Sequence, residues 1–275
     1  MCIRDSNRDV SRTGELVHAL PEALANGEIQ AHVQAAVDAL SGELVHVEAL
    51  ARWERSGGET VNPGVFIPLV ESYGLAAQLT TTVLESVARF VDTSPVPNDI
   101  RVWVNVSPRE LDVANFSERF VASLRQLNLS PSRIGIEITE TAAVRDPQRL
   151  AVEFRRLREH GICIAIDDFG NGYSPLGYLR FLPIDLVKLD RSLITAIDTD
   201  RANQHIVTGI VGLTDELSIG IVAEGVEREA EREWLLDNGV NIMQGYLFDR
   251  PMAPDVFDWR PSLTRYMPQV SPSVV

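Results

Sequence analysis

Short apolar runs rich in β-branched residues alternate along the chain with segments of helical periodicity. The runs that predict strands span residues 28–34, 44–50, 101–106, 133–139, 162–167, 184–189, 219–224 and 241–246. Helical periodicity fills most of the intervals between them, at residues 64–90, 115–128, 147–161, 201–218 and 227–239. Strands that alternate with helices in this way predict an α/β fold, a single-domain (β/α)₈ barrel whose active site lies at the carboxyl ends of the strands.

The two ends of the chain lack this pattern. We interpret residues 1–15 as a linker or a non-native start, residues 16–258 as the barrel domain, and residues 259–275, which are rich in Pro and Ser, as a loose C-terminal tail. A length of 275 residues with 45% hydrophobic content is enough for one large core, which agrees with a single domain.

Composition and charge exclude several classes of protein. No apolar run reaches the length of a membrane span and the start resembles no signal peptide, so we expect no direct membrane contact. Cys2 and Cys163 are too few for a disulfide framework, which predicts a cytoplasmic protein. A formal net charge of −14 argues against binding of long nucleic acid but permits a small anionic ligand held through cations.

Strand parity sorts each run into an outer and an inner face, because alternate residues of a strand point to opposite sides. In residues 162–167 the isoleucines share one face, whereas Cys163, Ala165 and Asp167 share the other. Large apolar groups thus face the helices, and small groups ending in a carboxylate face the barrel interior. The same sorting places one polar residue near the inner carboxyl end of each of seven strands: Glu48, Asn105, Glu137, Asp167, Lys188, Glu224 and Gln244.

Each of these residues alone has an ordinary explanation, such as a solvated strand end, a helix cap or a snorkelling lysine. Together, four carboxylates converging on one site would repel each other without cations, so the series predicts a metal site. The histidines offer no alternative ligands, because His18, His32, His160 and His205 lie away from the strand ends. His46, on the inner face two residues before Glu48, is better interpreted as filling the barrel.

The ligand types favour Mg²⁺ or Mn²⁺ over zinc, because Glu, Asp and Asn offer oxygen atoms. The adjacent carboxylates Asp167 and Asp168 suit two ions about 3.5–4 Å apart, one carboxylate bridging and its neighbour binding the second ion. Two-ion sites commonly activate water against a phosphoryl centre, so the residues alone predict hydrolysis of a phosphate ester.

Seven motifs together resemble one family. They are "EALARW" at 48–53, "NVS" at 105–107, "EITE" at 137–140, "DDFGNGYS" at 167–174, "VKLD" at 187–190, "AEGVE" at 223–227 and "QGYLFDRPM" at 244–252. In order and spacing they resemble the EAL-domain cyclic di-GMP phosphodiesterases, from about Leu20 to Pro254. The resemblance implies hydrolysis of cyclic di-GMP to linear pGpG with two ions, Mg²⁺ or Mn²⁺, and inhibition by Ca²⁺.

The resemblance also implies a role for individual residues. Glu48, Asn105, Glu137 and Asp167 correspond to the ligands of the first ion, and Asp167 would bridge to a second ion held with Asp168. Further roles follow for seven residues: Glu224 near the second ion as a base, Lys188 on the attacking water or the phosphate, Arg52 on a substrate phosphate, Gln34 and Gln244 at the substrate site, Glu140 in support of the loop 168–177, and Glu227 as a second supporting glutamate.

Partners are also implied. The segment 172–183 gathers Tyr173, Leu176, Tyr178, Leu179 and Phe181, which predicts a homodimer contact or, as an equal alternative, packing onto the protein's own barrel. Residues 16–28 resemble the helix that joins such domains to an upstream GGDEF or sensor domain, so a longer and even membrane-anchored parent protein is an open possibility.

Some residues depart from the family pattern. Asn171 and Pro175 replace Thr and Ser in the loop, residues 31–38 lack the usual aromatic and proline, and His46 stands where glycine is frequent. Three alternatives stay open: a receptor that binds cyclic di-GMP without cleaving it, a structural domain, and another phosphoesterase. Receptors of this fold usually lack metal ligands and structural domains lack the polar strand ends, whereas this sequence has both.

Overall fold

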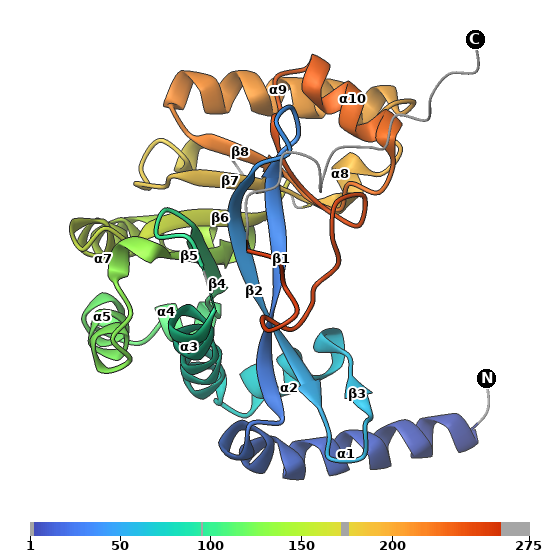
Figure 1. The fold of residues 1–275 in the computed structure, drawn as a ribbon, viewed down its shortest axis with the longest axis vertical. Helices are drawn as coiled ribbons and strands as arrows, with labels where there is room; N and C mark the ends of the chain where they lie inside the picture. Colours follow the sequence, from blue (N-terminus) through green and yellow to red (C-terminus); the bar gives the residue numbers. More distant parts are fainter. Residues whose placement is uncertain (1–2, 95, 172–175, 260–275) are drawn as a thin grey trace.

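A closed barrel of eight strands forms the centre of the computed structural model, which describes residues 3–94, 96–171 and 176–259, with side chains from Thr13 onward except at Leu176 (Figure 1). Its strands are β1 (Ile29–Asp38), β2 (Leu44–Glu54), β4 (Arg101–Asn105), β5 (Ile134–Thr139), β6 (Cys163–Phe169), β7 (Leu186–Leu189), β8 (Gly220–Ala223) and β9 (Ile242–Gln244). They pair in the order β1-β9-β8-β7-β6-β5-β4-β2, and β1 closes the ring against β2. The predicted barrel is confirmed.

The first strand differs from the expected alternation of strand and helix. No helix separates β1 from β2; the two form a hairpin, and β1 runs antiparallel to both β2 and β9. The tight turn has a local cause, because Asp38 Oδ1 accepts hydrogen bonds from the backbone amides of Leu40 and Ser41. Gly42 follows with φ +73°, a conformation that glycine adopts without strain. The other neighbouring strands of the ring, from β2 to β9, are parallel.

Helices surround the strands. They are α1 (Ile3–Asn26), α2 (Pro63–Ser72), α3 (Ala76–Thr93), α4 (Pro108–Leu111), α5 (Phe116–Gln126), α6 (Glu140–Arg145), α7 (Pro147–Glu159), α8 (Arg191–Ile194), α9 (Arg201–Leu217) and α10 (Glu229–Asp237), with 3₁₀ turns η1 (Pro131–Arg133) and η2 (Leu176–Tyr178) and a short strand β3 (Thr60–Val61). The periodic stretch 64–90 is two helices, because the chain turns at Gly74, which has φ +71°.

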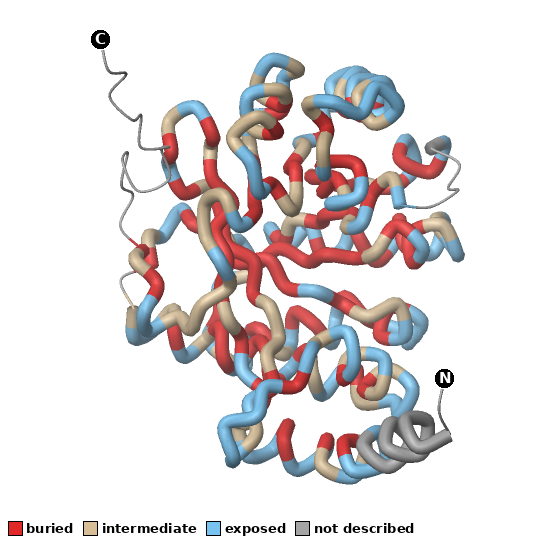
Figure 2. Tube along the Cα trace, turned by 90° about the vertical axis from the view of Figure 1, so that its right-hand side faces the viewer, coloured by how far each residue is buried: buried red, intermediate tan, exposed pale blue. Residues whose placement is uncertain are grey.

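The main core packs the strands against the surrounding helices. Figure 2 shows that the buried residues concentrate along the central part of the trace. The outward isoleucines are almost completely buried: Ile134 and Ile164 are 0% exposed and Ile138 is 1% exposed. Burying one such side chain contributes about 1.5–3 kcal/mol. The inner face needs small residues, because a Cβ on Gly135 would lie 2.3 Å from the ring of Trp103.

A second apolar cluster joins α1 and α2 to the open end of the β1–β2 hairpin, opposite its turn. Leu16 and Leu20 of α1 share this cluster with Trp53 and Phe66, whose rings meet edge to face at 5.8 Å. Helix α1 thus begins within the segment 1–15, whose role as a linker stays a prediction. At the other end Trp259, placed by the sequence at the start of the tail, is 2% exposed and stacks on Phe90 at 5.4 Å. Residues 260–275 lie outside the described residues.

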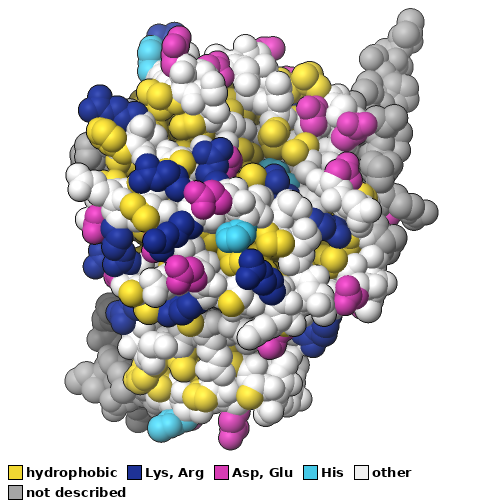
Figure 3. All heavy atoms as spheres, turned by 90° about the vertical axis from the view of Figure 1, so that its left-hand side faces the viewer, with side chains coloured by type: hydrophobic (Ala, Val, Ile, Leu, Met, Phe, Trp, Pro, Cys, Tyr) yellow, Lys and Arg dark blue, Asp and Glu magenta, His cyan; other side chains and the backbone are white. Residues whose placement is uncertain are grey.

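Charge is unevenly distributed over the surface. The face that carries α5 and α7 displays many basic side chains despite the formal net charge of −14 (Figure 3). These two helices contribute Arg119, Arg125, Arg149, Arg155, Arg156 and Arg158. None of the helices in residues 3–94, 96–171 and 176–259 combines the length and the apolar character needed to span a membrane.

Candidate active site at the carboxyl ends of the strands

Seven polar side chains form one connected cluster near the carboxyl ends of the parallel strands; six lie in a strand and Glu224 directly follows β8. They are Glu48, Asn105, Glu137, Asp167, Lys188, Glu224 and Gln244, the residues that strand parity placed inside the barrel. The register explains the meeting, since Asn105 is paired with Glu137 on the neighbouring strand.

Lys188 lies in the middle of the cluster. Its Nζ is 2.5 Å from Glu224 Oε1, 2.9 Å from Glu137 Oε1, 3.2 Å from Glu48 Oε2 and 3.6 Å from Asp167 Oδ1. The side chain is 0% exposed, and Lys188 is the chain's single lysine. One ammonium facing four carboxylates leaves an excess of negative charge, which favours the uptake of protons or of further cations.

Two side-chain amides orient the buried carboxylates. Asn105 Nδ2 donates to Glu48 Oε1 at 2.8 Å and to Glu137 Oε2 at 3.3 Å. Gln244 Nε2 donates to Glu48 Oε2 at 2.7 Å and to Gln34 Oε1 at 3.1 Å, while Gln34 Nε2 donates to the carbonyl of Asp249. Because Asn105 uses its nitrogen for both carboxylates, its Oδ1 remains to meet a bound group.

The four carboxyl groups differ in pKa, because burial raises the pKa of each but the contacts that oppose this rise differ. Burial raises the pKa of Glu224 to about 8, although Lys188 opposes this rise, and burial together with Glu48 raises the pKa of Glu137 well above its ordinary value. Burial also raises the pKa of Asp167. Glu48 is the exception: burial opposes its ionisation, but Lys188 and the hydrogen bonds from Gln244 and Asn105 lower its pKa to about 2.

The chemistry of this donor set fits divalent cations, because it consists of carboxylate and amide oxygens from Glu, Asp and Asn. Asp167 Oδ1 is buried, faces Lys188 Nζ at 3.6 Å and has no closer hydrogen-bond partner among the described residues, so it suits the role of a ligand atom. Within the described part of the chain, however, no three His, Cys, Asp or Glu side chains are already arranged around a metal position. Lys188 Nζ lies among the carboxylates instead.

Asp168 lies directly after Asp167, within the irregular end of β6, where the register against β7 shifts between Ile166 and Phe169. It has φ +54°, and Gly170, at the turn that follows β6, has φ +93°. Burial and repulsion from Asp167 and Asp190 raise the pKa of Asp168 to about 6. Gly170 N donates to Glu140 Oε2 at 3.1 Å, which ties the start of the loop 168–177 to α6. Pro175 of this loop lies outside the described residues, and Asn171 is exposed.

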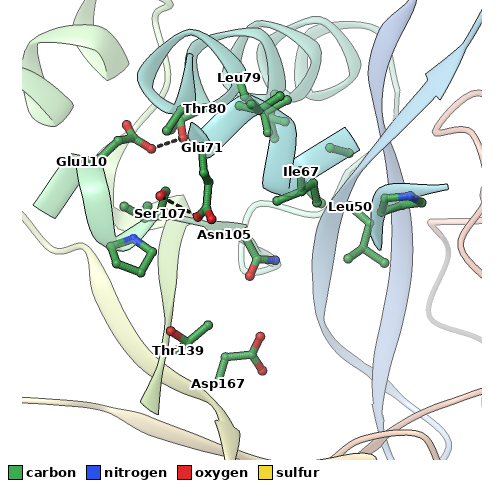
Figure 4. Close-up of a pocket in the computed structure, with 18 of the residues that line it drawn as sticks. Leu50, Ile67, Glu71, Leu79, Thr80, Asn105, Ser107, Glu110, Thr139 and Asp167 are labelled. Atoms are coloured by element: carbon green, nitrogen blue, oxygen red, sulfur yellow. Dashed lines mark hydrogen bonds between the residues drawn. The ribbon is translucent and has the colours of Figure 1, made fainter. Parts of the chain in front are cut away.

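Cavities flank the cluster on two sides. The larger, about 310 Å³, runs from Asp167 and Asn105 toward α2 and α3, and Figure 4 shows its apolar wall around Ile67 and Leu79. Arg52 lines it and is half-buried, and burial lowers the pKa of its guanidinium. The smaller, about 250 Å³, holds Gln34, Glu48, Glu224, Gln244 and Glu227. Glu227 Oε1 pairs there with Arg191 Nη2 at 2.9 Å, away from Lys188.

The larger cavity contains residues for which the sequence analysis predicted no role at the site. Glu71 Oε1 accepts a hydrogen bond from Ser107 Oγ at 2.7 Å, and Glu110 Oε1 accepts one from Thr80 Oγ1 at 2.6 Å (Figure 4). The motif Ser-Pro-Arg-Glu from residue 107 is a capping-box pattern and signals a helix start there. Nothing in the sequence indicates the partner Glu71.

His46 lies inside the barrel on the same face as Glu48. It is 5% exposed, its ring meets that of Trp103 at 5.7 Å, and burial lowers the pKa of its imidazole to about 3. A neutral, enclosed histidine fits its interpretation as a barrel-filling residue.

The segment expected at a homodimer contact divides into two parts. Tyr178 and Leu179 are buried in the protein's own core, whereas Phe181 is 59% exposed under Arg180, whose Cζ lies 4.7 Å from the ring centre. Tyr173 and the side chain of Leu176 lie outside the described residues. The homodimer stays a prediction.

Known proteins share this sequence and architecture. The family model described as EAL domain matches residues 17–251. The bifunctional diguanylate cyclase/cyclic di-GMP phosphodiesterase MucR of Pseudomonas aeruginosa is 37% identical over 253 residues, which cover 90% of this chain and 37% of MucR. The probable cyclic di-GMP phosphodiesterase PdeG of Escherichia coli is 36% identical over 243 residues, which cover 85% of this chain and 46% of PdeG. The chain thus spans less than half the length of either relative.

Solved structures agree with these matches. A structure described as PaMucR phosphodiesterase in complex with c-di-GMP has a TM-score of 0.81 and 38% identity, covering 88% of this chain and 98% of that one. A calcium/cy-diGMP complex of Klebsiella pneumoniae BlrP1 has a TM-score of 0.73 and 28% identity, covering 82% of this chain and 56% of that one. The seven motifs, the barrel and these matches together place this chain in the EAL domain family.

Proposed function

We propose that this chain hydrolyses cyclic di-GMP to linear pGpG with the help of two divalent cations, Mg²⁺ or Mn²⁺. The observation that carries the proposal is the convergence of Glu48, Glu137, Asp167 and Glu224 with Asn105 on one cluster around the buried Lys188 and beside two cavities. Its support from other proteins is that MucR and PdeG are named as phosphodiesterases of this nucleotide.

In this proposal the oxygens at the strand ends hold the cations. Glu48, Asn105, Glu137 and Asp167 would hold the first ion, and Asp167 and Asp168, with Glu224 nearby, would hold the second. When bound, the ions would stabilise negative charge on the attacking and leaving oxygens and lower the pKa of water. The raised pKa values of Asp167 and Glu224 agree with this role, because a nearby cation would reverse the repulsion that contributes to them.

Three side chains of this protein would then act on the substrate and the attacking water. Arg52 lines the larger cavity and offers a planar guanidinium to a phosphate of the dinucleotide. Lys188 would steady the attacking water or the phosphate through its buried ammonium. Glu224, with a pKa raised to about 8 without metal, titrates near neutral pH and suits the transfer of the water proton.

Four further residues would hold this arrangement in place. Gln34 and Gln244 form a hydrogen-bonded chain that ends on Glu48 Oε2, beside the smaller cavity where one end of the substrate would lie. Glu140 holds the turn after Asp168 through Gly170. Glu227 fixes Arg191 at the rim of the smaller cavity.

The reaction breaks one of the two phosphodiester links. The water oxygen forms a new bond to phosphorus, and the bond from phosphorus to the 3′ oxygen breaks. One water proton leaves through the base and one proton reaches the 3′ oxygen. The product is linear, with a 5′ phosphate and a free 3′ hydroxyl, which is pGpG.

A receptor that binds cyclic di-GMP without cleaving it is the alternative from another class. It is disfavoured because each ligand position of the motifs keeps an oxygen donor: Glu48, Asn105, Glu137, Asp167 and Asp168. The test is incubation with cyclic di-GMP and Mg²⁺ or Mn²⁺, followed by chromatography. Appearance of pGpG supports the enzyme, and tight binding without product supports the receptor.

The cellular setting is part of the proposal. We place the reaction in the cytoplasm, as the cysteine content predicts. We also propose an upstream GGDEF or sensor domain in a longer parent protein, because residues 16–28 resemble a joining helix and MucR is named as a bifunctional protein with a diguanylate cyclase activity.

A further inference from the structure

Ser107 connects the proposed cation site to helix α2. Its hydroxyl donates to Glu71 Oε1 at 2.7 Å and accepts from the backbone amide of Arg109 at 3.2 Å, where it caps α4 (Figure 4). The hydroxyl thus donates one hydrogen bond and accepts one within the protein. These two bonds fix the orientation of Ser107 and, with it, the chain that leaves β4.

Asn105 ends β4 two residues earlier. The backbone between them is held on a second side, because Val106 N donates to the carbonyl of Glu137 at 2.9 Å. Residues 105–107 are thus clamped between β5 and α2. The clamp matters for the amide of Asn105, since a small shift of this backbone would lengthen its bonds of 2.8 Å to Glu48 and 3.3 Å to Glu137.

Glu71 itself is firmly anchored. Helix α2 begins at a cap in which Asn62 Oδ1 accepts from Gly64 N at 2.8 Å. Phe66 and Val70 on the same helix are 0% exposed and belong to the cluster around Trp53. The carboxylate next to Val70 therefore projects from a rigid support.

We propose that Glu71 is a positioning residue, which acts through Ser107 to hold Asn105 Oδ1 toward the first cation. The inference rests on the proposed function, because it assumes a cation at Asn105. No hydrogen bond or ion pair among the described residues joins Glu71 to Lys188 or to the four carboxylates around it. The effect of Glu71 on the site therefore passes through Ser107. The contact spans 36 residues of sequence.

The test compares Glu71→Leu and Ser107→Ala with Glu71→Gln, which keeps an oxygen acceptor for Ser107. Glu85→Leu is the matched control, because Glu85 is an exposed glutamate on the neighbouring helix α3. Mn²⁺ affinity is measured by calorimetry without substrate, alongside thermal unfolding, kcat and KM. Supporting groups behind metal ligands typically contribute about 10–100-fold to affinity.

We expect Glu71→Leu and Ser107→Ala each to weaken Mn²⁺ binding about tenfold. The double variant should bind Mn²⁺ no more weakly than Ser107→Ala, because all three lose the hydrogen bond between Glu71 and Ser107, and Ser107→Ala already removes the cap of α4. Glu71→Gln and Glu85→Leu should bind like the wild type. An unchanged Mn²⁺ affinity in Glu71→Leu would overturn this inference and leave the proposed function standing. A rise in KM at unchanged Mn²⁺ affinity would also overturn it and make Glu71 a substrate contact. Absence of Mn²⁺ binding in the wild type would sink the proposed function as well.

Discussion

Lys188 Nζ lies 2.9 Å from Glu137 Oε1, and both side chains are 0% exposed. Removing one partner of such a buried pair strongly destabilises the folded state, because the remaining charge has no water to stabilise it. We therefore expect Lys188→Met to lower the free energy of unfolding by about 3–5 kcal/mol without metal. Mg²⁺ should restore part of this loss, because it replaces the missing positive charge, but should not restore turnover.

Denaturant unfolding of both proteins, with Mg²⁺ and with a chelator, measures this effect. Unchanged stability of Lys188→Met in the chelator would contradict a cluster held together by the ammonium.

Asp167→Asn separates an enzyme from a receptor. The substitution keeps the shape of the side chain but removes the charge that would bridge two ions, so turnover should fall by several orders of magnitude. Affinity for cyclic di-GMP should fall less, because contacts such as that of Arg52 do not depend on the bridge. Hydrolysis assays and calorimetry in Ca²⁺ measure the two quantities, and near wild-type hydrolysis by the variant would refute the bridging role.

Metal identity should decide activity. We expect turnover with Mg²⁺ or Mn²⁺ and inhibition by Ca²⁺, because Ca²⁺ takes more ligands at longer distances and would disturb two closely spaced ions. The comparison needs product formation at equal, saturating concentrations of each ion, and then Ca²⁺ titrated against Mg²⁺. Equal rates with Ca²⁺ and Mg²⁺ would count against the two-ion site.

Metal affinity should rise with pH. The pKa of Glu224 is raised to about 8 in the folded protein without metal, so this carboxyl group keeps a proton below that pH and must release it to bind an ion. Mn²⁺ affinity should therefore increase as the pH rises through 8. Stability without metal changes the opposite way: the contribution of protonated Glu224 is lost as the pH rises from its ordinary pKa of 4.5 through 8.

Calorimetry in buffers of different ionisation enthalpy counts the protons released, and Glu224→Gln provides the comparison. A wild type and a Glu224→Gln variant with the same pH dependence would show that another group takes up the proton.

Association into dimers should depend on the exposed ring of Phe181. This residue is 59% exposed, whereas Tyr178 and Leu179 nearby are used in the protein's own core. Phe181→Asp should therefore convert the expected dimer to a monomer without loss of stability, since the ring belongs to no apolar cluster among the described residues. Light scattering and thermal unfolding check the two parts. A wild-type monomer at tens of micromolar would end the dimer prediction.

The inner and outer faces of the strands were determined by the sequence. Alternation with period two is a property of the local backbone, so it assigned Asp167, Glu137 and Lys188 to the barrel interior without knowledge of their neighbours. The strand ends then met because parallel strands bring their carboxyl ends to one edge of the barrel. The order of the seven motifs along the chain supported the resemblance to the family.

Only the tertiary structure decided how these residues interact. The short turn between Asp38 and Leu44 makes β1 antiparallel to β2. Barrel closure added the antiparallel pairing with β9, which periodicity does not reveal, because alternation looks the same in either direction. Depth of burial shifted the pKa values of Glu224 and Glu137, and depth depends on the packed helices and strands around them. The contact between Glu71 and Ser107 joins segments 36 residues apart. No local pattern specifies such a pair, because its energy exists only after α2 has docked against the barrel.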